Sequence, residues 1–331
     1  MVKVMTRNLY LGAEIDTAMN VSTRDEIPAA VAALWAQVQQ NDFPGRARLI
    51  AHEIAAESPD IVALQEVELF RMQSPSDFQP GAAPNAEATA PNGDMLAILQ
   101  AELVAAGLDY GDPVVTASHS DTELPAVDAS GASFDLRMTD RDVVFVRSTL
   151  TASNPRAENF ASMFSAPLGG LSSGIFVKLS RGYASVDLLA QGVPFTFVNT
   201  HLEVGGILST IQESQAKELL DGLAPLAGQV ILAGDFNSAA DGSTTKSYQT
   251  VTGVFADAWP EVNDKDPGPT CCTDLQATAP APTDRIDLVL YRGKLRPEAA
   301  GRVGLDPSER TPGGLLASDH VGVVTTLTVG M

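Results

Sequence analysis

The chain has 331 residues, of which 44% are hydrophobic and 19% are charged, and its formal net charge is -20. This length and this apolar fraction are sufficient for a large buried core. The acidic excess argues against a general nucleic-acid-binding surface, because nonspecific affinity for a polyanion comes mainly from Lys and Arg. A locally basic cleft remains compatible with this charge balance.

Membrane and export signals are weak in this sequence. No apolar run reaches the roughly 18 residues expected of a membrane span, so no transmembrane segment is predicted. The apolar stretch at the start of the chain is too short for the core of a signal peptide and is expected to form a strand. The compartment stays open, with a secreted or periplasmic protein whose signal peptide has been removed as one alternative.

The two cysteines, Cys271 and Cys272, are adjacent in the chain. Consecutive α-carbons lie about 3.8 Å apart across a trans peptide, which is short for a disulfide. We therefore expect two small packed thiols, with a redox or intermolecular role as the alternative.

The first third of the chain predicts a strand, two helices and a second strand. Residues 2–12 alternate in hydropathy and break at Gly12, as a strand entering a loop does. Apolar residues recur at helical spacing over 24–43, and a second helix is expected after Gly45, ending before Ser58-Pro59. The segment IVALQEV around Glu66 then has the apolar character of a buried strand.

Three further segments lack clear periodicity and are expected to be loops, near 72–92, 116–135 and 152–173. Between and after them the pattern predicts helices over 95–106 and 210–223. It predicts strands at DVVFVR, IFVKL, ASVDLLA, FTFVNTHLE, VILAGDFNS, RIDLVLY and HVGVVTTLTV. With no composition shift to mark a linker, residues 1–331 are expected to form one domain with a mixed α/β architecture.

Four of the apolar segments end in acids, amides or histidines, at Glu66, His201, Asp235 and Asp319-His320. Active sites of open α/β sheets lie where strands end, so these four ends are expected to converge. Carboxylates combined with amides and imidazoles suit a hard divalent cation that polarises a phosphoester.

The ordered motifs resemble the endonuclease/exonuclease/phosphatase superfamily, which has the deoxyribonuclease I-like fold. The resemblance runs from Asn8 through Gln65-Glu66, 199–202, 234–237 and 285–287 to Ser318-Asp319-His320. It implies a four-layer sandwich of two mixed β-sheets packed face to face, with outer helices. The opening TRNLYLG and the closing RIDLVL are similar to uncharacterised bacterial members, which are often exported.

The resemblance also suggests roles for ten residues, beginning with the metal. Glu66 is the main candidate ligand for Mg²⁺ or Mn²⁺, with Ca²⁺ as a further option, and Asn8 and Asp319 are expected in its first or second shell. Asp235 is expected to orient or deprotonate water, and Asn237 to hold a phosphate oxygen. We expect both side chains on the same face, because they are two residues apart on an extended chain.

The remaining predicted site residues concern proton transfer and substrate contact. His320 is expected to act as a general base or to stabilise charge, with Asp287 fixing its tautomer. His201 is expected to donate to a phosphate oxygen or the leaving group, and an acid at 140–142 to orient it. Asn199 and Arg141 are the candidate substrate contacts.

We predict a divalent-metal-dependent hydrolase of phosphoester bonds that acts on a small phosphoester or a nucleic acid. A phosphodiesterase is the favoured type. A nuclease and a sphingomyelinase-like enzyme are alternatives within the same chemistry. Two alternatives come from other classes. Gly170–Gly174 matches GxSxG, so Ser172 is a candidate nucleophile if a strand and a helix flank it. A binding module that has lost activity is the other.

Overall fold

The computed structural model describes residues 1–330 and contains two large β-sheets. The eight-stranded sheet consists of β1 (Val2–Asn8), β2 (Ile61–Gln65), β3 (Leu69–Gln73), β4 (Ala88–Asp94), β5 (Val115–Val127), β6 (Ser133–Val146), β15 (Leu295–Val303) and β16 (Gly322–Val329). The six-stranded sheet consists of β7 (Thr151–Asn159), β10 (Gly182–Ala190), β11 (Val193–His201), β12 (Val230–Asp235), β13 (Ala256–Asp257) and β14 (Asp287–Arg292).

The other elements are a two-stranded hairpin and the helices. The hairpin pairs β8 (Phe164–Pro167) with β9 (Phe176–Leu179). The α-helices are α1 (Asp16–Met19), α2 (Ile27–Gln40), α3 (Phe43–Glu57), α4 (Met95–Ala105), α5 (Ser209–Leu223), α6 (Ser247–Thr252) and α7 (Ala258–Val262). Three short 3₁₀ turns cover Arg24–Glu26, Leu171–Ser173 and Gly206–Leu208. Among residues 1–330, no helix combines the length and the apolar character needed to cross a membrane.

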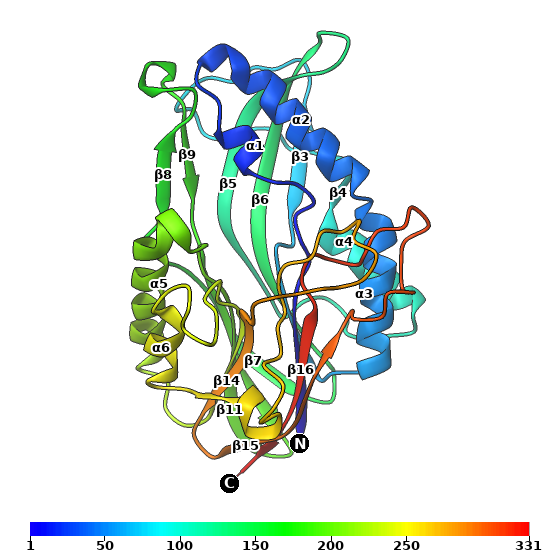
Figure 1. Cartoon of the computed structure of the whole chain (residues 1–331), viewed down its shortest axis with the longest axis vertical. Coiled ribbons are helices and arrows are strands. Elements are labelled where there is room, and N and C mark those ends of the chain that lie inside the picture. The colour runs from blue at the N-terminus through cyan, green and yellow to red at the C-terminus, as the bar shows by residue number, and fades with distance from the viewer. Residues whose placement is uncertain (331) are drawn as a thin grey trace.

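Alternating side chains on the central strands build the four layers. Val4 and Ile61 of the first sheet meet Phe197 and Ile231 of the second in the core between the sheets. Their neighbours in sequence face the opposite way, because successive side chains of a strand alternate. Met5, Val62 and Leu64 pack on α3 and α4, while Val198 and Leu232 pack on α5 and α6. Figure 1 shows the two pairs of helices on opposite sides of the sheets. The predicted mixed α/β sandwich with outer helices is confirmed.

The strand register brings the polar strand ends together. β1 and β2 run parallel with Asn8 opposite Gln65, and β11 and β12 run parallel with His201 opposite Asp235. β14 runs antiparallel to β12, so Asp287 at its start lies opposite Asp235 at the end of β12. Since these ends share one edge of the sandwich, the side chains beyond them meet there.

Most of the predicted loop at 72–92 lies outside helices and strands, over residues 74–87, whereas 116–135 and 152–173 are largely strands and that part of the prediction was wrong. Segment 72–92 contains the end of β3 and the start of β4, and 116–135 is mostly β5 and its turn into β6. Segment 152–173 contains β7 and β8, and every residue of β7 except Arg156 is exposed. These strands lie at edges or project beyond the core, so polar side chains and Pro155 are tolerated there and hydrophobic alternation is weak.

The cysteine prediction also needs correction, because Cys271 and Cys272 form a disulfide. The peptide bond between them is cis, and their α-carbons lie 3.0 Å apart. The sequence argument assumed a trans bond, which separates neighbouring α-carbons by about 3.8 Å.

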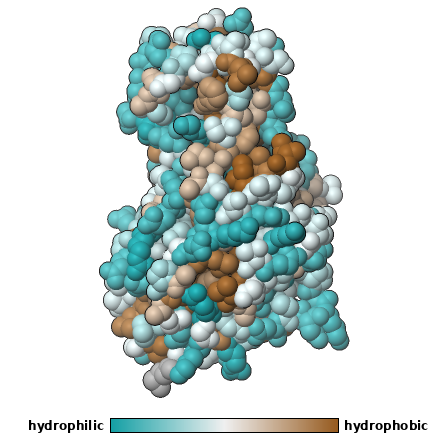
Figure 2. Space-filling view, turned by 90° about the vertical axis from the view of Figure 1, so that its left-hand side faces the viewer, coloured by the Kyte–Doolittle hydropathy of each residue, from teal (hydrophilic) through white to brown (hydrophobic). Residues whose placement is uncertain are grey.

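The face carrying the β8–β9 hairpin and α5 mixes hydrophilic surface with several separate hydrophobic groups (Figure 2). Leu171 and Phe176 of the hairpin loop and strand, and Ile207 before α5, are exposed apolar residues of these elements. Isolated exposed apolar residues are common on soluble domains and assign no function by themselves.

A buried ion pair links the first strand, β1, to α3 and to the segment that precedes the last strand, β16. The Arg7 guanidinium donates to both carboxylate oxygens of Glu53 in α3, at 2.9 and 3.1 Å, and also to the carbonyl oxygen of His320. Both side chains are almost fully buried. This pair therefore ties α3 to the backbone of a predicted catalytic residue.

Removing Glu53 should cost far more stability than removing a surface acid of the same helix. Glu53→Ala leaves the Arg7 charge buried without its partner, so the free energy of unfolding should fall by about 3 to 5 kcal/mol. Glu57→Ala is the matched control, since its pair with Lys3 is about one-third exposed and should be worth under about 1 kcal/mol. Urea denaturation followed by circular dichroism measures both, and equal losses would contradict this assignment.

Candidate active site

The first half of the site is centred on Glu66, which follows β2. Glu66 has a positive φ of 54°, a backbone turn that directs it away from the strand. Its Oε1 accepts from Asn8 Nδ2 at 3.0 Å, and its Oε2 accepts from the backbone N–H of Leu11 at 2.7 Å. Burial, followed by the charge of Asp319, raises the pKa of Glu66. Glu66 and Asp319 are thus two repelling carboxylates held close together.

Asn8 connects this half of the site to the second sheet. Its Nδ2 also donates to Asp235 Oδ2 at 3.0 Å, while its Oδ1 accepts from the Tyr10 backbone N–H at 2.8 Å. With this orientation Asn8 positions the two carboxylates and does not present its oxygen to a cation. The single hydroxyl hydrogen of Ser318 is shared between the Asn8 carbonyl oxygen, 2.9 Å from Oγ, and Asp319 Oδ1, 3.2 Å from it, so Ser318 holds Asp319 close to Asn8.

Asp235 lies at the centre of the constellation. The preceding residue must be Gly, because Gly234 has φ +147° and a Cβ there would collide with the Thr200 carbonyl oxygen of the adjacent strand. Burial, followed by the charge of Asp287, raises the pKa of Asp235 to about 7. Its Oδ2 lies 3.6 Å from His201 Nε2 and 3.8 Å from His320 Nε2.

His320 and Asp287 form a buried pair beside Asp235. The two are joined through Nδ1 and Oδ2 at 2.8 Å. Burial alone would lower the pKa of His320, but the carboxylates of Asp287, Asp319 and Asp235 outweigh it and raise that pKa well above its usual value. Asp287 contacts Nδ1 and thereby orients the ring, and the raised pKa favours the doubly protonated imidazolium.

His201 has the opposite electrostatic environment. Burial, then the charges of Arg181 and His320, lower its pKa well below the usual value. Arg181 NH1 lies 3.1 Å from His201 Nδ1 and 2.7 Å from Asp140 Oδ2. Because a guanidinium can only donate, Nδ1 is the acceptor and the proton of the neutral ring is on Nε2.

Asn237 reaches the same place by a route other than the expected one. The chain is not extended after Asp235, since Asn237 has φ +48° and its backbone N–H donates back to Asp235 Oδ1 at 2.8 Å. Its Nδ2 donates to the Leu202 carbonyl at 2.9 Å and lies 3.2 Å from His201 Nε2. With the proton of His201 on Nε2, two N–H groups face each other with no acceptor between them.

Asn199 and Arg141, the two predicted substrate contacts, do not point into the site. Asn199 is fully buried; its Nδ2 donates to the Leu64 and Val143 carbonyls, and its Oδ1 accepts from Gln65 Nε2 at 2.6 Å. Arg141 donates to the Val67 and Glu68 carbonyls and to Asp94. Both side chains are committed to the scaffold, so neither fits direct contact with a substrate.

Arg181 is the basic residue of the site, and the sequence analysis missed it. It lies between β9 and β10 in LSRG, where nothing but its charge stands out. The expected acid at 140–142 does orient His201, but Asp140 acts through Arg181. The second acid, Asp142, pairs instead with the buried His119, at 3.2 Å.

Two groups of donors suit a cation. Glu66 and Asp319 offer carboxylate oxygens, and Asp235 and Asp287 bring two more carboxylate oxygens within 4.8 Å of each other beside His320. Asp287 Oδ1 is buried and has no hydrogen-bond partner among the described residues. Such an oxygen-rich set fits a hard divalent cation. Cys271, Cys272 and His320 also cluster, but the disulfide leaves no thiolate to bind a metal.

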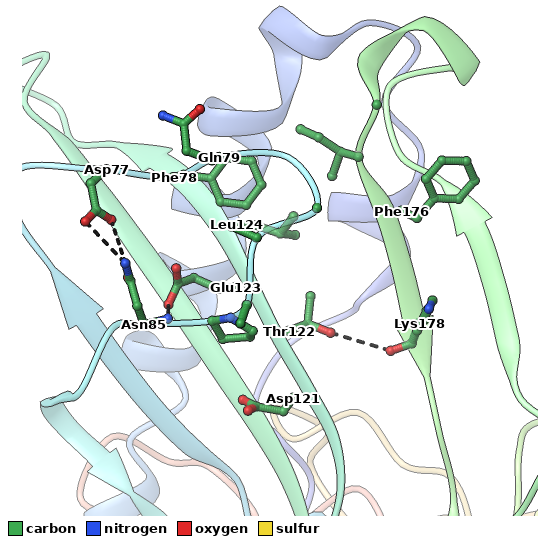
Figure 3. A pocket seen from close by; sticks show the side chains of 16 residues that line it. Asp77, Phe78, Gln79, Asn85, Asp121, Thr122, Glu123, Leu124, Phe176 and Lys178 are labelled. Atoms are coloured by element: carbon green, nitrogen blue, oxygen red, sulfur yellow. Dashed lines mark hydrogen bonds between the residues drawn. The ribbon is translucent and has the colours of Figure 1, made fainter.

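A separate cavity of about 750 Å³ lies away from these residues, between the loop at 77–85, β5 and β9 (Figure 3). Asn85 closes one side through Asp77 and Glu123, and Thr122 donates to the Lys178 carbonyl. Its lining contains none of the predicted catalytic residues.

The sequence profile of the Endonuclease/Exonuclease/phosphatase family matches residues 34–320, and the chain therefore belongs to this family. Members of the family are phosphoester hydrolases that typically use divalent metal ions. No curated protein matches the chain significantly.

Solved structures agree with this assignment across 99% of the chain. An endonuclease/exonuclease/phosphatase from Beutenbergia cavernae is 25% identical, with a TM-score of 0.58 and 72% of its own length covered. A humanized TDP2 from D. rerio (16% identity, TM-score 0.54, 98% covered) shares the fold. So does a mannosyl-6-phosphatase from Bacteroides thetaiotaomicron (16% identity, TM-score 0.51, 100% covered).

Nuclear magnetic resonance can test the assigned protonation of the histidines, since the chain has four. In metal-free protein at pH 7, His201 should be neutral with its proton on Nε2, and His320 should be doubly protonated. The reason is that Arg181 opposes a charge on His201, whereas three carboxylates favour one on His320. Long-range ¹H–¹⁵N spectra report both states, and single His→Gln variants assign the signals.

Arg181→Met is the matched variant for this measurement. Without the guanidinium, the pKa of His201 should rise and its preference for the Nε2–H tautomer should weaken, while the His320 signals change little. A charged His201 or a neutral His320 in the unsubstituted protein would contradict the account.

Proposed function

We propose that this protein is a divalent-metal-dependent phosphodiesterase. The observation that carries the proposal is the contact of Asn8 with both Glu66 and Asp235. Two histidines lie beside Asp235, His201 in its neutral form and His320 in its positively charged form. This places candidate metal-binding carboxylates next to a proton acceptor, a cationic donor and a neutral donor.

The metal would be held by Glu66 and Asp319, with Asp235 and Asp287 as further carboxylates nearby. A bound Mg²⁺ or Mn²⁺ would neutralise charge on the nonbridging oxygens and thereby admit a nucleophile to an anionic ester. Ca²⁺ fits the same oxygen donors. The remaining chemistry falls to the side chains of this chain.

Asp235 is suited to accept a proton from the attacking water. Its pKa near 7 leaves a substantial deprotonated fraction at neutral pH and still gives a base strong enough to be useful. The raised pKa of His320 suits a proton donor, which favours the charge-stabilising role over that of a general base. His320 can donate from Nε2 to a phosphate oxygen or to the leaving alcohol.

The facing N–H groups of His201 and Asn237 form a ready site for a nonbridging oxygen. Their nitrogens are 3.2 Å apart, and an oxygen accepting from both would replace a donor–donor contact with two hydrogen bonds. Arg181, behind His201, adds positive charge without reaching the reacting atoms.

The competing readings have less support. Ser172 lies exposed in a 3₁₀ turn between β8 and β9, and no strand-to-helix elbow is formed around it. The presence of a full set of acid, base and anion-binding groups weighs against an inactive binding module. For a nuclease, one TDP2 structure contains a single-stranded DNA product, but that likeness is 15% identical and concerns the fold.

Hydrolysis of bis(p-nitrophenyl) phosphate tests this function. Activity should vanish after chelation and return with Mg²⁺ or Mn²⁺. Glu66→Gln and Asp235→Asn should each lower kcat/KM by at least about 100-fold, because each removes a group acting on the transition state. Glu57→Gln, at a half-buried position far along α3, and Asp241→Asn, at an exposed position, are controls that should stay within about twofold. Full activity in both site variants would overturn the mechanism.

We also propose that the protein functions in an oxidising compartment, outside the cytoplasm. The support is the Cys271–Cys272 disulfide, since disulfides persist mainly in secreted and periplasmic proteins. Thiol alkylation and mass spectrometry of protein from its natural host would test this. An unalkylated, bridged pair is expected, and two alkylated cysteines would contradict it.

A further inference from the structure

A second groove, of about 430 Å³, adjoins the proposed catalytic centre. It shares Tyr10 and Asp319 with that centre: the Tyr10 backbone N–H binds Asn8, and the charge of Asp319 acts on Glu66. A substituent on a phosphate held by the catalytic groups can therefore extend into it. The polar side chains of its lining come mainly from Tyr10, Gln37, Gln40, Asn41 and Gln276.

Much of the hydrogen-bonding capacity in this groove is unused. Gln40 and Gln276 are exposed, and neither their side-chain amides nor the Tyr10 hydroxyl form a hydrogen bond within residues 1–330, so a ligand can take the place of water on them. Gln37 uses its Oε1, which accepts from the Glu14 backbone N–H at 3.3 Å, and leaves its amide hydrogens free. Amides and a hydroxyl can each donate and accept, which suits a ligand rich in hydroxyl groups.

The charge of the groove excludes a second anion. Its lining includes Glu14, Asp274 and Asp319 but no Lys or Arg. A neighbouring phosphate of a nucleic-acid strand would be repelled there, since backbone recognition depends on cations. The group that enters should therefore carry no negative charge, and the amide and hydroxyl lining favours a group rich in hydroxyls.

Aromatic stacking, which is the usual way to bind an unpaired base, is also limited. Tyr10 is the one aromatic residue of the lining, and the buried Arg46 guanidinium covers a face of its ring, 5.6 Å from the centroid.

From this geometry we propose that the groove binds a neutral polyhydroxylated alcohol, such as glycerol or a hexose, esterified to the phosphate that the enzyme cleaves. The inference rests on the proposed function and specifies its substrate class. Glycerol and a hexose share adjacent hydroxyl groups, and the experiment below distinguishes between these two alcohols.

Binding of four phosphate monoesters to the Mg²⁺-loaded protein tests the proposal by calorimetry. The probes are methyl phosphate, glycerol 3-phosphate, glucose 6-phosphate and thymidine 5′-monophosphate. At least one polyol phosphate should bind about tenfold more tightly than methyl phosphate, as one or two additional hydrogen bonds would provide. Whichever of glycerol 3-phosphate and glucose 6-phosphate binds more tightly shows whether the groove prefers glycerol or a hexose.

The double variant Gln40→Leu/Gln276→Leu should bring the ratio of polyol to methyl phosphate affinity down to within about twofold of unity. Gln79→Leu, in the separate cavity of Figure 3, is the matched control and should keep the original ratio. A ratio near one in the unsubstituted protein, a ratio that survives in the double variant, or tightest binding of thymidine 5′-monophosphate would overturn the proposal.

Hydrolysis of methyl p-nitrophenyl phosphate distinguishes this failure from failure of the proposed function. If the ester is cleaved and no polyol preference exists, the groove assignment alone is wrong. If the ester is not cleaved while the affinity ratio behaves as expected, the proposed reaction is wrong and the groove assignment stands.

Discussion

Two buried amides join the sheets at the edge where the polar strand ends meet. Asn8 of β1 donates to Glu66 on its own sheet and to Asp235 on the other, and Asn199 of β11 hydrogen-bonds with Gln65 and two carbonyls across the gap. Buried polar groups of this kind are costly unless they are fully paired. Apolar contacts between the sheets are non-directional, whereas these hydrogen bonds specify one alignment of the strand ends.

The electrostatics of the site follow from that alignment. Asp235 is surrounded by Asp287, His201 and His320, and burial makes each of these charges count for more than it would in water. The carboxylates around His320 stabilise its protonated form and raise its pKa, whereas burial and Arg181 lower the pKa of His201 and keep it neutral. Two imidazoles on one carboxylate thus acquire different tasks because one faces acids and the other faces a guanidinium.

The sequence was sufficient for the sandwich and for most of the residues that converge. Buried strands such as IVALQ and VILAG are continuous apolar runs, so their ends could be recognised, and the motif order supplied the rest. The sequence did not predict the strands β5, β7 and β8, because their polar side chains, which suit edge positions, hide the hydrophobic alternation of a strand. Arg181 has no local sequence signal, and Arg141 is an equally plausible site cation from sequence, although in the structure it donates to the Glu68 carbonyl and to Asp94. Likewise, a cis bond at Cys271 is invisible in the sequence.

The central claim is that Glu66 and Asp319 hold a divalent cation beside Asp235. Anomalous diffraction from crystals soaked in Mn²⁺ tests it most directly, because the signal locates the ion without reference to activity. The account predicts a strong anomalous peak within coordination distance of the Glu66 carboxylate and near Asp319, which is lost in Glu66→Gln crystals. A peak found only at surface acids, or an unchanged peak in the variant, would contradict it.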